Sequence, residues 1–415
     1  MPTSSLAQAA AALSRRLDAL SKVSDDAGAT TRTFLSPAMR RANALVGGWM
    51  RESGLDVRED AVGNLIGRTQ PQSAGVKTLL LGSHLDTVKD AGRFDGTLGV
   101  LLPLAALDVL RGRGLSLPFA VEVLGFSEEE GVRFSSAYLG SKGYTGRLRK
   151  SDLTLSDPEG VTVAEALKVL GFPAALPAAA HAPSDLLGYL EVHIEQGPVL
   201  EDRGLPAGVV SAIAGQTRGK VVFTGEAGHA GATPMGLRRD ALAGAAEFIM
   251  EVEAYARTRT PLVATVGRIA AHPGASNVIA GSAELTLDVR HPADAPRRAA
   301  LRHLLGAGRS IARRRRLGFS LAITQDNGAV ACSRELSALL GESVRARQGS
   351  TLSLPSGAGH DAVIVSSLTP VAMLFVRCRR GLSHHPDEFV KKSDLKAALG
   401  IVVDFLERLA ARTSA

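Results

Sequence analysis

The sequence predicts an α/β protein in which a smaller α+β domain interrupts a larger one. Three observations support this prediction: four short apolar runs that end in polar residues, helical segments between them, and a central stretch with a different pattern. A chain of 415 residues is also too long for one compact core, so two domains are expected.

The four apolar runs have the length and composition of buried strands, and helical patterns separate them. The runs lie at residues 78–86, 119–131, 187–197 and 369–388, with helices expected at 98–114 and 161–171 among others. Alternation of this kind builds a sheet that helices cover on both faces. Ligands of such sheets bind beyond the carboxyl ends of the strands, which is where each run places its polar residues.

The central stretch, residues 213–328, predicts an inserted α+β domain. Strands are expected at 218–228, 262–272, 283–291 and 317–326, and helices at 238–258 and 294–316. The resulting order β-α-β-β-α-β is that of a ferredoxin-like fold. The larger domain then consists of residues 1–212 and 329–415.

The charge and the aromatic content of the chain bear on whether it binds nucleic acid. The chain carries a net charge of +7, and four consecutive arginines stand at residues 313–316. A nucleic-acid-binding surface is one interpretation, but an aromatic content of 4% argues against base stacking, and a solvated helix end explains the arginines. We therefore expect no nucleic-acid partner.

Three further features of the sequence bear on the compartment and on membrane association. No apolar run reaches the roughly 18 residues of a membrane span, so no membrane association is expected. The first 22 residues place arginines after their apolar stretch, which favours an amphipathic helix over a secretory signal. The only two cysteines, Cys332 and Cys378, cannot form a disulfide framework, so we expect a cytoplasmic protein.

Histidines and acids at the ends of the four runs predict a metal centre. The candidates are His84, Asp95, Glu129, Glu130, His193 and His384. Imidazole and carboxylate ligands without thiolates suit zinc, manganese, cobalt or nickel in a hydrolytic site. A lone histidine near a strand end is more often structural, but four such strand ends together favour metal binding.

The acidic run at residues 128–130 needs a partner of opposite charge. Three adjacent carboxylates raise one another's pKa, and a dication would remove that penalty while leaving one carboxylate to act as a base. A solvated acidic loop is the alternative, although the preceding run is mostly apolar. Asp86 lies two residues after His84, on the same side of an extended chain, and is expected to orient that histidine.

Seven motifs spread over about residues 30–410 resemble one family. They are GSHLDTV, GRFDGTLGV, EEEGVRF, HIEQGPVL, GEAGHAGATPMGLRRDA, SGAGHDA and GLSHHPDEF. Their order is similar to that of the amidase branch of the M20 metallopeptidase superfamily, which contains allantoate amidohydrolases, N-carbamoyl-L-amino acid hydrolases and beta-ureidopropionases. The resemblance implies a homodimer whose subunits have a dinuclear metal domain and an inserted lid domain that also dimerises.

The resemblance also implies a role for each candidate residue. His84 and His193 would hold one metal ion, Glu130 and His384 the second, Asp95 would bridge the two, and Glu129 would be the general base. His229 would polarise the scissile carbonyl in the partner subunit's active site. The substrate pocket would be lined by Gln196, Gln216, Asn277, Arg290, Gly359 and His360, with Asn277 and Arg290 on the substrate carboxylate.

The activity implied is hydrolysis of a linear ureide that carries a carboxylate. The motif HLDTVKDAGRFDG favours allantoate, giving ureidoglycine, ammonia and carbon dioxide. An N-carbamoyl-L-amino acid or beta-ureidopropionate is the alternative. A dipeptidase of the same superfamily is a further rival, but His193 stands where the peptidases usually have a carboxylate.

Overall fold

The computed structural model describes residues 5–70, 73 and 75–413. Two compact units divide the chain. The first comprises Met1–Ser211, Cys332–Leu354 and Gly359–Ala415, and the second comprises Ala212–Ala331 and Pro355–Ala358. The segment Pro355–Ala358 joins the second unit although it lies outside the central stretch 213–328. Residues 1–4 of the expected N-terminal helix lie outside the described residues.

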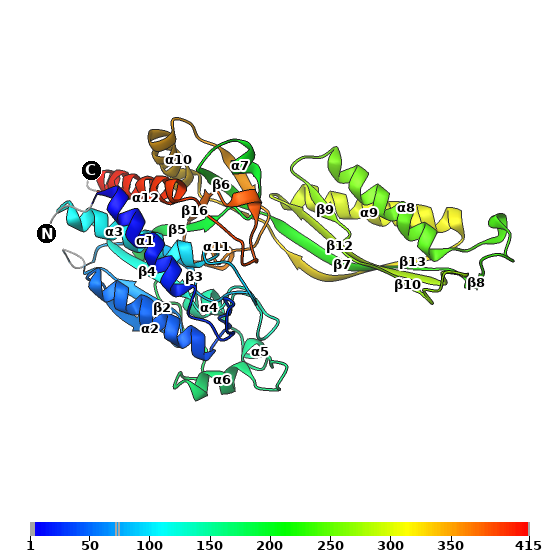
Figure 1. Ribbon diagram of the computed structural model, residues 1–415, viewed down its shortest axis with the longest axis horizontal. Helices are drawn as coiled ribbons and strands as arrows, with labels where there is room; N and C mark the ends of the chain where they lie inside the picture. Colours follow the sequence, from blue (N-terminus) through cyan, green and yellow to red (C-terminus); the bar gives the residue numbers. More distant parts are fainter. Residues whose placement is uncertain (1–4, 71–72, 74, 414–415) are drawn as a thin grey trace. The chain divides into compact units, whose positions relative to one another are not determined.

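A nine-stranded mixed sheet has most of its strands in the larger unit (Figure 1). Its order is β1-β2-β4-β3-β5-β16-β6-β14, with β15 paired to β6. The strands are β1 (Asp56–Glu59), β2 (Leu65–Arg68), β3 (Thr78–His84), β4 (Ala120–Phe126), β5 (Leu186–Ile194), β6 (Ala207–Ile213), β14 (Val330–Ala331), β15 (Ser353–Ser356) and β16 (Val371–Val376). The middle strands β4, β3, β5 and β16 are parallel, whereas β2 and β6 join them antiparallel. The predicted α/β fold with a mixed sheet is confirmed.

Helices enclose this sheet. They are α1 (Leu6–Leu20), α2 (Pro37–Glu52), α3 (Thr97–Gly112), α4 (Leu139–Tyr144), α5 (Lys150–Leu153), α6 (Val163–Val169), α7 (Val199–Asp202), α10 (Arg334–Gln348), α11 (Ala362–Val365) and α12 (Lys392–Thr413), with 3-10 turns at Pro183–Asp185 and Arg379–Gly381. Helix α3 packs on β3, β4 and β5 and also contacts α1 and α12, which explains why it is apolar on nearly every side. None of the described helices combines the length and apolar composition needed to cross a bilayer.

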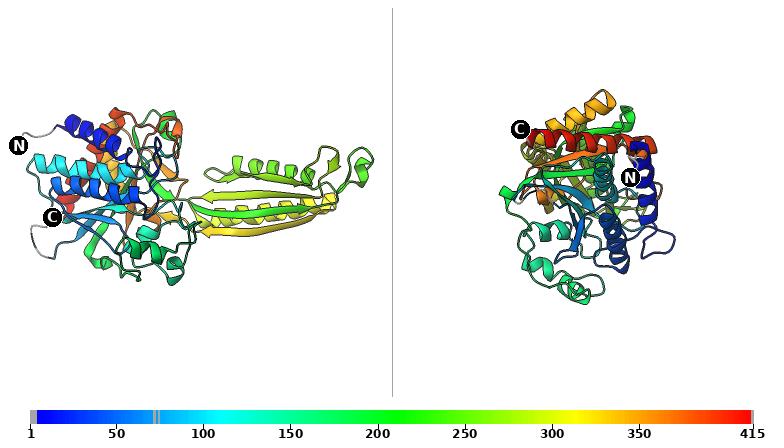
Figure 2. Two further views of the ribbon diagram at one scale, coloured as in Figure 1. Left: turned by 60° about the horizontal axis from the view of Figure 1, so that its bottom comes forward. Right: turned by 90° about the vertical axis from the view of Figure 1, so that its left-hand side faces the viewer.

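The second unit contains a five-stranded sheet in the order β10-β12-β7-β13, with β9 paired to β12 (Figure 2). Its elements are β7 (Gly215–Thr224), β8 (Gly228–His229), α8 (Ala241–Arg257), β9 (Val263–Thr265), β10 (Ile269–His272), β11 (Val278–Ile279), β12 (Ser282–His291), α9 (Asp294–Arg315) and β13 (Gly318–Asn327), with a 3-10 turn at Met235–Leu237. All pairs in this sheet are antiparallel. The single strand expected at 262–272 is two short strands, β9 and β10.

Alternation along the long strands explains why one face of this second sheet is buried. Val221 and Phe223 of β7 and Leu285 and Leu287 of β12 join a core with residues of α8 and α9, while the intervening residues lie on the opposite face. The arginine run at 313–316 ends α9. Within it, Arg314 and Arg315 both pair with Glu247 of α8, as expected of a solvated helix end.

Candidate metal centre

The candidate residues follow parallel strands at one edge of the larger sheet. The register pairs His84 at the end of β3 with Phe126 at the end of β4, and it pairs His193 near the end of β5 with Phe375 of β16. The acidic run at 128–130 begins just after β4. Because the carboxyl ends of parallel strands share one edge, residues far apart in the sequence converge there.

Asp95 lies at the centre of this cluster, and its two carboxylate oxygens face different histidines. Oδ1 lies 3.1 Å from Nε2 of His193, and Oδ2 lies 3.1 Å from Nε2 of His384. His384 Nε2 is also 3.3 Å from Oε1 of Glu130. The carboxylate of Asp95 is buried and reaches both sides of the cluster.

Three overlapping groups of side chains have ligand atoms within 4.8 Å of one another. They are His84–Asp95–His193, Asp95–Glu130–His384 and His84–Glu129–Glu130. The first two share only Asp95. All five expected metal ligands and the expected base therefore lie in one connected cluster.

The histidines present their Nε2 atoms to the cluster. Nδ1 of His84 lies 2.9 Å from the backbone oxygen of Asp86, and Nδ1 of His193 lies 2.9 Å from that of Ile194. A carbonyl partner assigns the proton to Nδ1 and leaves the Nε2 lone pair as the ligand. Imidazole nitrogens and carboxylate oxygens in two groups that share one aspartate fit two ions of the zinc, manganese, cobalt or nickel class.

Electrostatics favours cations at the same place. Burial raises the pKa of Glu129 well above its usual range, and the charge of Glu130 raises it further. Although burial opposes the ionisation of Asp95, His193 and His384 donate to it through Nε2 when their rings are doubly protonated, and these hydrogen bonds hold its pKa well below the usual value. Buried carboxylates this close repel one another, and a bound dication removes that cost.

The three consecutive glutamates diverge. Glu129 and Glu130 belong to the groups described above, whereas the carboxylate of Glu128 is buried and turns back to accept from the backbone N–H of Gly131. The carboxylate of Asp86 accepts from the N–H groups of Glu129 at 3.0 Å and Glu130 at 3.2 Å. Asp86 thus fixes the acidic turn through its side chain, while its backbone oxygen orients His84.

Gln196, Gly359 and His360, expected in the substrate pocket, also lie in the larger unit. Nε2 of Gln196 donates to Oδ1 of Asp95 and to Oγ of Ser383, both at 3.2 Å. The ring of His360 is buried and meets that of His193 edge-on, with centroids 4.5 Å apart. A Cβ at Gly359 would collide with the hydroxyl of Tyr138, so the chain passes close to that ring.

The remaining candidates form two pairs within the second unit. His229 of β8 pairs with Val278 of β11, and the oxygen of the preceding Asn277 accepts from the N–H of Ala230. On the long strands, Arg290 of β12 lies directly opposite Gln216 of β7.

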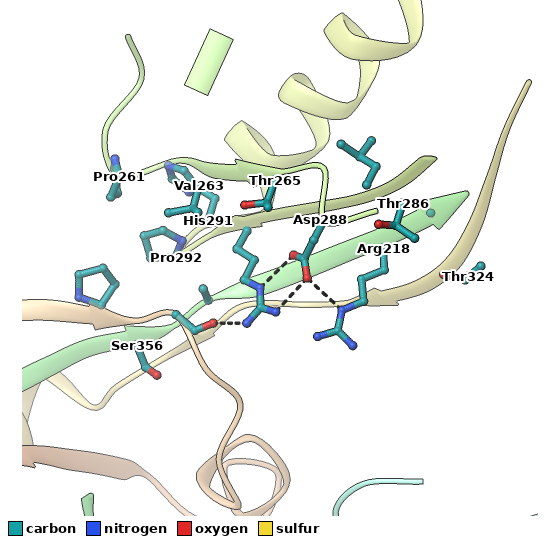
Figure 3. Close-up of a pocket in the computed structure, with 17 residues that line it drawn as sticks. Arg218, Pro261, Val263, Thr265, Thr286, Asp288, His291, Pro292, Thr324 and Ser356 are labelled. Atoms are coloured by element: carbon teal, nitrogen blue, oxygen red, sulfur yellow. Dashed lines mark hydrogen bonds and ion pairs between the residues drawn. The ribbon is translucent and has the colours of Figure 1, made fainter. Parts of the chain in front are cut away.

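Arg290 borders a pocket of about 700 Å³ in the second unit (Figure 3). Its Nε and Nη2 donate to the carboxylate of Asp288, both at 2.9 Å, and its Nη1 donates to the oxygen of Gly357 at 2.6 Å. Arg218 donates to the same carboxylate at 3.0 Å. Asp288 therefore holds two guanidinium groups at the wall of this pocket.

Two buried glutamates have roles that sequence reasoning missed. Glu195 accepts from the N–H groups of Val199 and Leu200, so it caps α7 instead of facing the cluster. Glu388 accepts from the N–H groups of Phe94 and Asp95, and burial together with the charge of Asp95 raises its pKa to about 7. The sequence shows only that Glu388 stands four residues after His384, in SHHPDE.

Comparisons with known proteins agree with this geometry. Residues 80–408 match peptidase family M20/M25/M40. An allantoate deiminase of Arabidopsis thaliana is 42% identical over 94% of this chain and 81% of its own, and an N-carbamoyl-L-amino-acid amidohydrolase of Pseudomonas sp. (strain NS671) is 40% identical over 88% and 89%. A hydantoinase/carbamoylase family amidase from Burkholderia multivorans has a similar structure, with a TM-score of 0.91, 32% identity, and coverage of 96% and 97%.

Proposed function

This chain belongs to peptidase family M20/M25/M40, and we propose that it is an amidohydrolase that cleaves a linear ureide, namely allantoate, to ureidoglycine, ammonia and carbon dioxide. The observation that carries the proposal is the placement of Asp95, whose two oxygens face the two halves of an imidazole–carboxylate cluster. The allantoate deiminase relative, aligned over most of both chains, supports the choice of substrate.

The proposal assigns two divalent ions to the cluster. His84 and His193 would hold one ion, Glu130 and His384 would hold the other, and Asp95, which belongs to both groups, would serve both ions. When bound, the ions supply Lewis acidity, which lowers the pKa of water and polarises the ureido carbonyl.

Glu129 moves the proton in this reaction. It is buried beside His84 and Glu130, and its backbone is fixed by Asp86. Its carboxylate takes a proton from the attacking water and returns it to the nitrogen that leaves. The raised pKa of Glu129 lies in the direction that a proton carrier needs.

Residues of the second unit make the substrate contacts in this proposal. Asn277 and Arg290 hold the substrate carboxylate, and His229 polarises the scissile carbonyl from the partner subunit, with Gln216 beside Arg290. A guanidinium fork suits a carboxylate, and Asp288 already holds that of Arg290 in a fixed orientation. Gln196 and His360 of the larger unit are also assigned to substrate contacts in this proposal.

A homodimer is part of the same proposal. The second unit exposes large apolar side chains on and before α8, among them Met235, Leu237 and Met250. We take these exposed apolar side chains as support for association through the second unit. A cytoplasmic location is supported by Cys332 and Cys378, which are both buried and unpaired.

A substrate panel tests the activity. We expect purified, metal-loaded protein to release ammonia from allantoate faster than from N-carbamoyl-L-amino acids or beta-ureidopropionate, with no cleavage of dipeptides. Free amino acid as a product would instead identify the carbamoylase activity, which the 40%-identical relative supports. Cleavage of dipeptides alone would refute the amidohydrolase proposal.

A further inference from the structure

Glu388 is a buried carboxylate that the proposed chemistry does not use. It lies in the segment between β16 and α12, with 2% of its surface exposed. Oε1 accepts from the backbone N–H of Phe94 at 2.8 Å and from that of Asp95 at 3.1 Å. Oε2 accepts from the hydroxyl of Ser383 at 3.0 Å. Burying a carboxylate is costly, and these three donors offset that cost.

The three donors belong to two loops that carry candidate ligands. Phe94 and Asp95 lie in the segment between β3 and α3, whereas Ser383 directly precedes His384, nearly 300 residues later. Glu388 therefore ties the backbone of one candidate ligand to the neighbour of another. The two loops are far apart in the sequence, and the hydrogen bonds of the Glu388 side chain join them directly.

Gln196, which follows the end of β5, contacts the same two loops. Its Nε2 donates to the Oγ of Ser383 and to Oδ1 of Asp95, both at 3.2 Å. The hydroxyl of Ser383 thus accepts from Gln196 and donates to Glu388. The backbone of Asp95 is held by Glu388 and its carboxylate by Gln196, which leaves little freedom for the side chain at the centre of the cluster.

Gly92 shows that the first loop is shaped around this carboxylate. A Cβ placed on Gly92 would collide with the carboxyl group and the Cβ of Glu388. The loop approaches Glu388 this closely because Gly92 has no side chain. This close approach is an observation independent of the three hydrogen bonds, and it also places the loop against Glu388.

We propose that Glu388 is a positioning residue that clamps the Asp95 and His384 loops in the arrangement in which one carboxylate reaches both halves of the centre. This inference rests on the proposed function, since it concerns the ions that the cluster would hold. Residues that orient metal ligands without touching the metal commonly change metal affinity by about 10- to 100-fold when they are replaced.

The test compares metal binding in four variants and the wild type. Metal-free protein is titrated with Mn²⁺, and free Mn²⁺ is followed by its EPR signal. We expect Glu388→Ala to weaken the binding of at least one ion by about 10- to 100-fold. Glu388→Gln should recover much of the affinity, because its amide oxygen can accept from the same two N–H groups. Gly92→Ala should resemble Glu388→Ala, because it displaces the carboxylate without removing it.

Glu122→Gln is the matched control. Glu122 is another buried carboxylate of the same unit with three partners, none of which is a candidate ligand. Its replacement should lower stability while leaving Mn²⁺ affinity unchanged. If Glu122→Gln and Glu388→Ala lose affinity equally, the effect of Glu388 is general destabilisation and the clamp is refuted.

A second measurement needs no metal. Hydrogen exchange of the Phe94 and Asp95 amides in metal-free protein should accelerate in Glu388→Ala, because those two N–H groups lose their acceptor. Unchanged exchange, or wild-type Mn²⁺ affinity in Glu388→Ala, overturns the clamp and leaves the proposed function standing. If exchange of the two amides accelerates in Glu388→Ala but the wild-type protein binds no Mn²⁺, the result refutes the proposed metal centre instead.

Discussion

Replacing Glu129 by glutamine changes one carboxylate oxygen to an amide nitrogen and preserves the shape of the side chain. Because the variant keeps His84, Asp95 and the other candidate metal ligands, we expect Glu129→Gln to bind the ions as the wild type does. It should lose about 10²- to 10⁴-fold in kcat, the usual contribution of a positioned proton carrier. Metal analysis and steady-state kinetics on the same preparation check the metal content and the loss of kcat. A variant with wild-type kcat would exclude Glu129 as the base.

Glu122 provides a prediction about stability and pH. Its carboxylate accepts from Arg68, Tyr144 and His181, at 2.8, 2.8 and 3.1 Å. Although burial opposes ionisation, the hydrogen bond and charge of His181 and the bonds from Tyr144 and Arg68 hold the pKa of Glu122 at about 2. Because this pKa is depressed, the stabilisation is complete at pH values above the pKa of glutamate in the unfolded chain, ~4.3, and is lost as the pH falls toward 2.

Glu122→Gln should therefore reduce the free energy of unfolding at pH 7 by about 2 kcal/mol. The deficit relative to the wild type should shrink by about 1 kcal/mol between pH 5 and pH 3.5, as the wild type loses its advantage. Urea unfolding followed by circular dichroism at several pH values measures this difference. A deficit that does not change with pH would mean that the ionised carboxylate is not its source.

At the scale of elements, the connection between β3 and α3 supplies both the bridging aspartate and the end of a helix. Gly96 caps α3 with φ +64, and a Cβ there would overlap the imidazole ring of His84. The loop can return close to His84 only because this position has no side chain. One glycine thus allows Asp95 to lie beside a histidine eleven residues earlier in the chain.

We expect Gly96→Ala to move His84 out of the cluster. Backbone strain at positive φ together with the overlap should lower stability by about 1–3 kcal/mol, and one ion should be lost or bound much more weakly. Thermal unfolding and metal analysis test the two effects. Gly114→Ala is the control, because Gly114 also has positive φ but a Cβ there would meet open space. Equal metal content in both variants would contradict the expected displacement.

The strand ends could be predicted from the sequence because each consists of an apolar run that stops at a histidine or an acid. His84 and His193 were identified on that local signal alone, and the structure places both in one cluster. The clamp by Glu388 has no such signal, since two of its three partners, Phe94 and Asp95, lie nearly 300 residues away. The expected strand at 262–272 is interrupted because residues 266–268 stand opposite only two residues of β12, Thr286 and Leu287, between its two pairings with that strand. Non-local pairing decides such features, and a local pattern cannot report it.

At the scale of the whole molecule, the proposal divides one active site between two subunits, and mixed dimers test this division. Glu129→Gln and His229→Ala homodimers should both be nearly inactive. If His229 acts in the partner subunit's site, a hybrid of the two variants has one site with both lesions and one with neither. Random mixing of equal amounts makes about half of the dimers hybrid, so about a quarter of the wild-type activity should return. Mixing without any return of activity would show that His229 serves its own subunit, and an active His229→Ala homodimer would show that it has no role in catalysis. The control mixes each variant with itself after the same dissociation and reassembly.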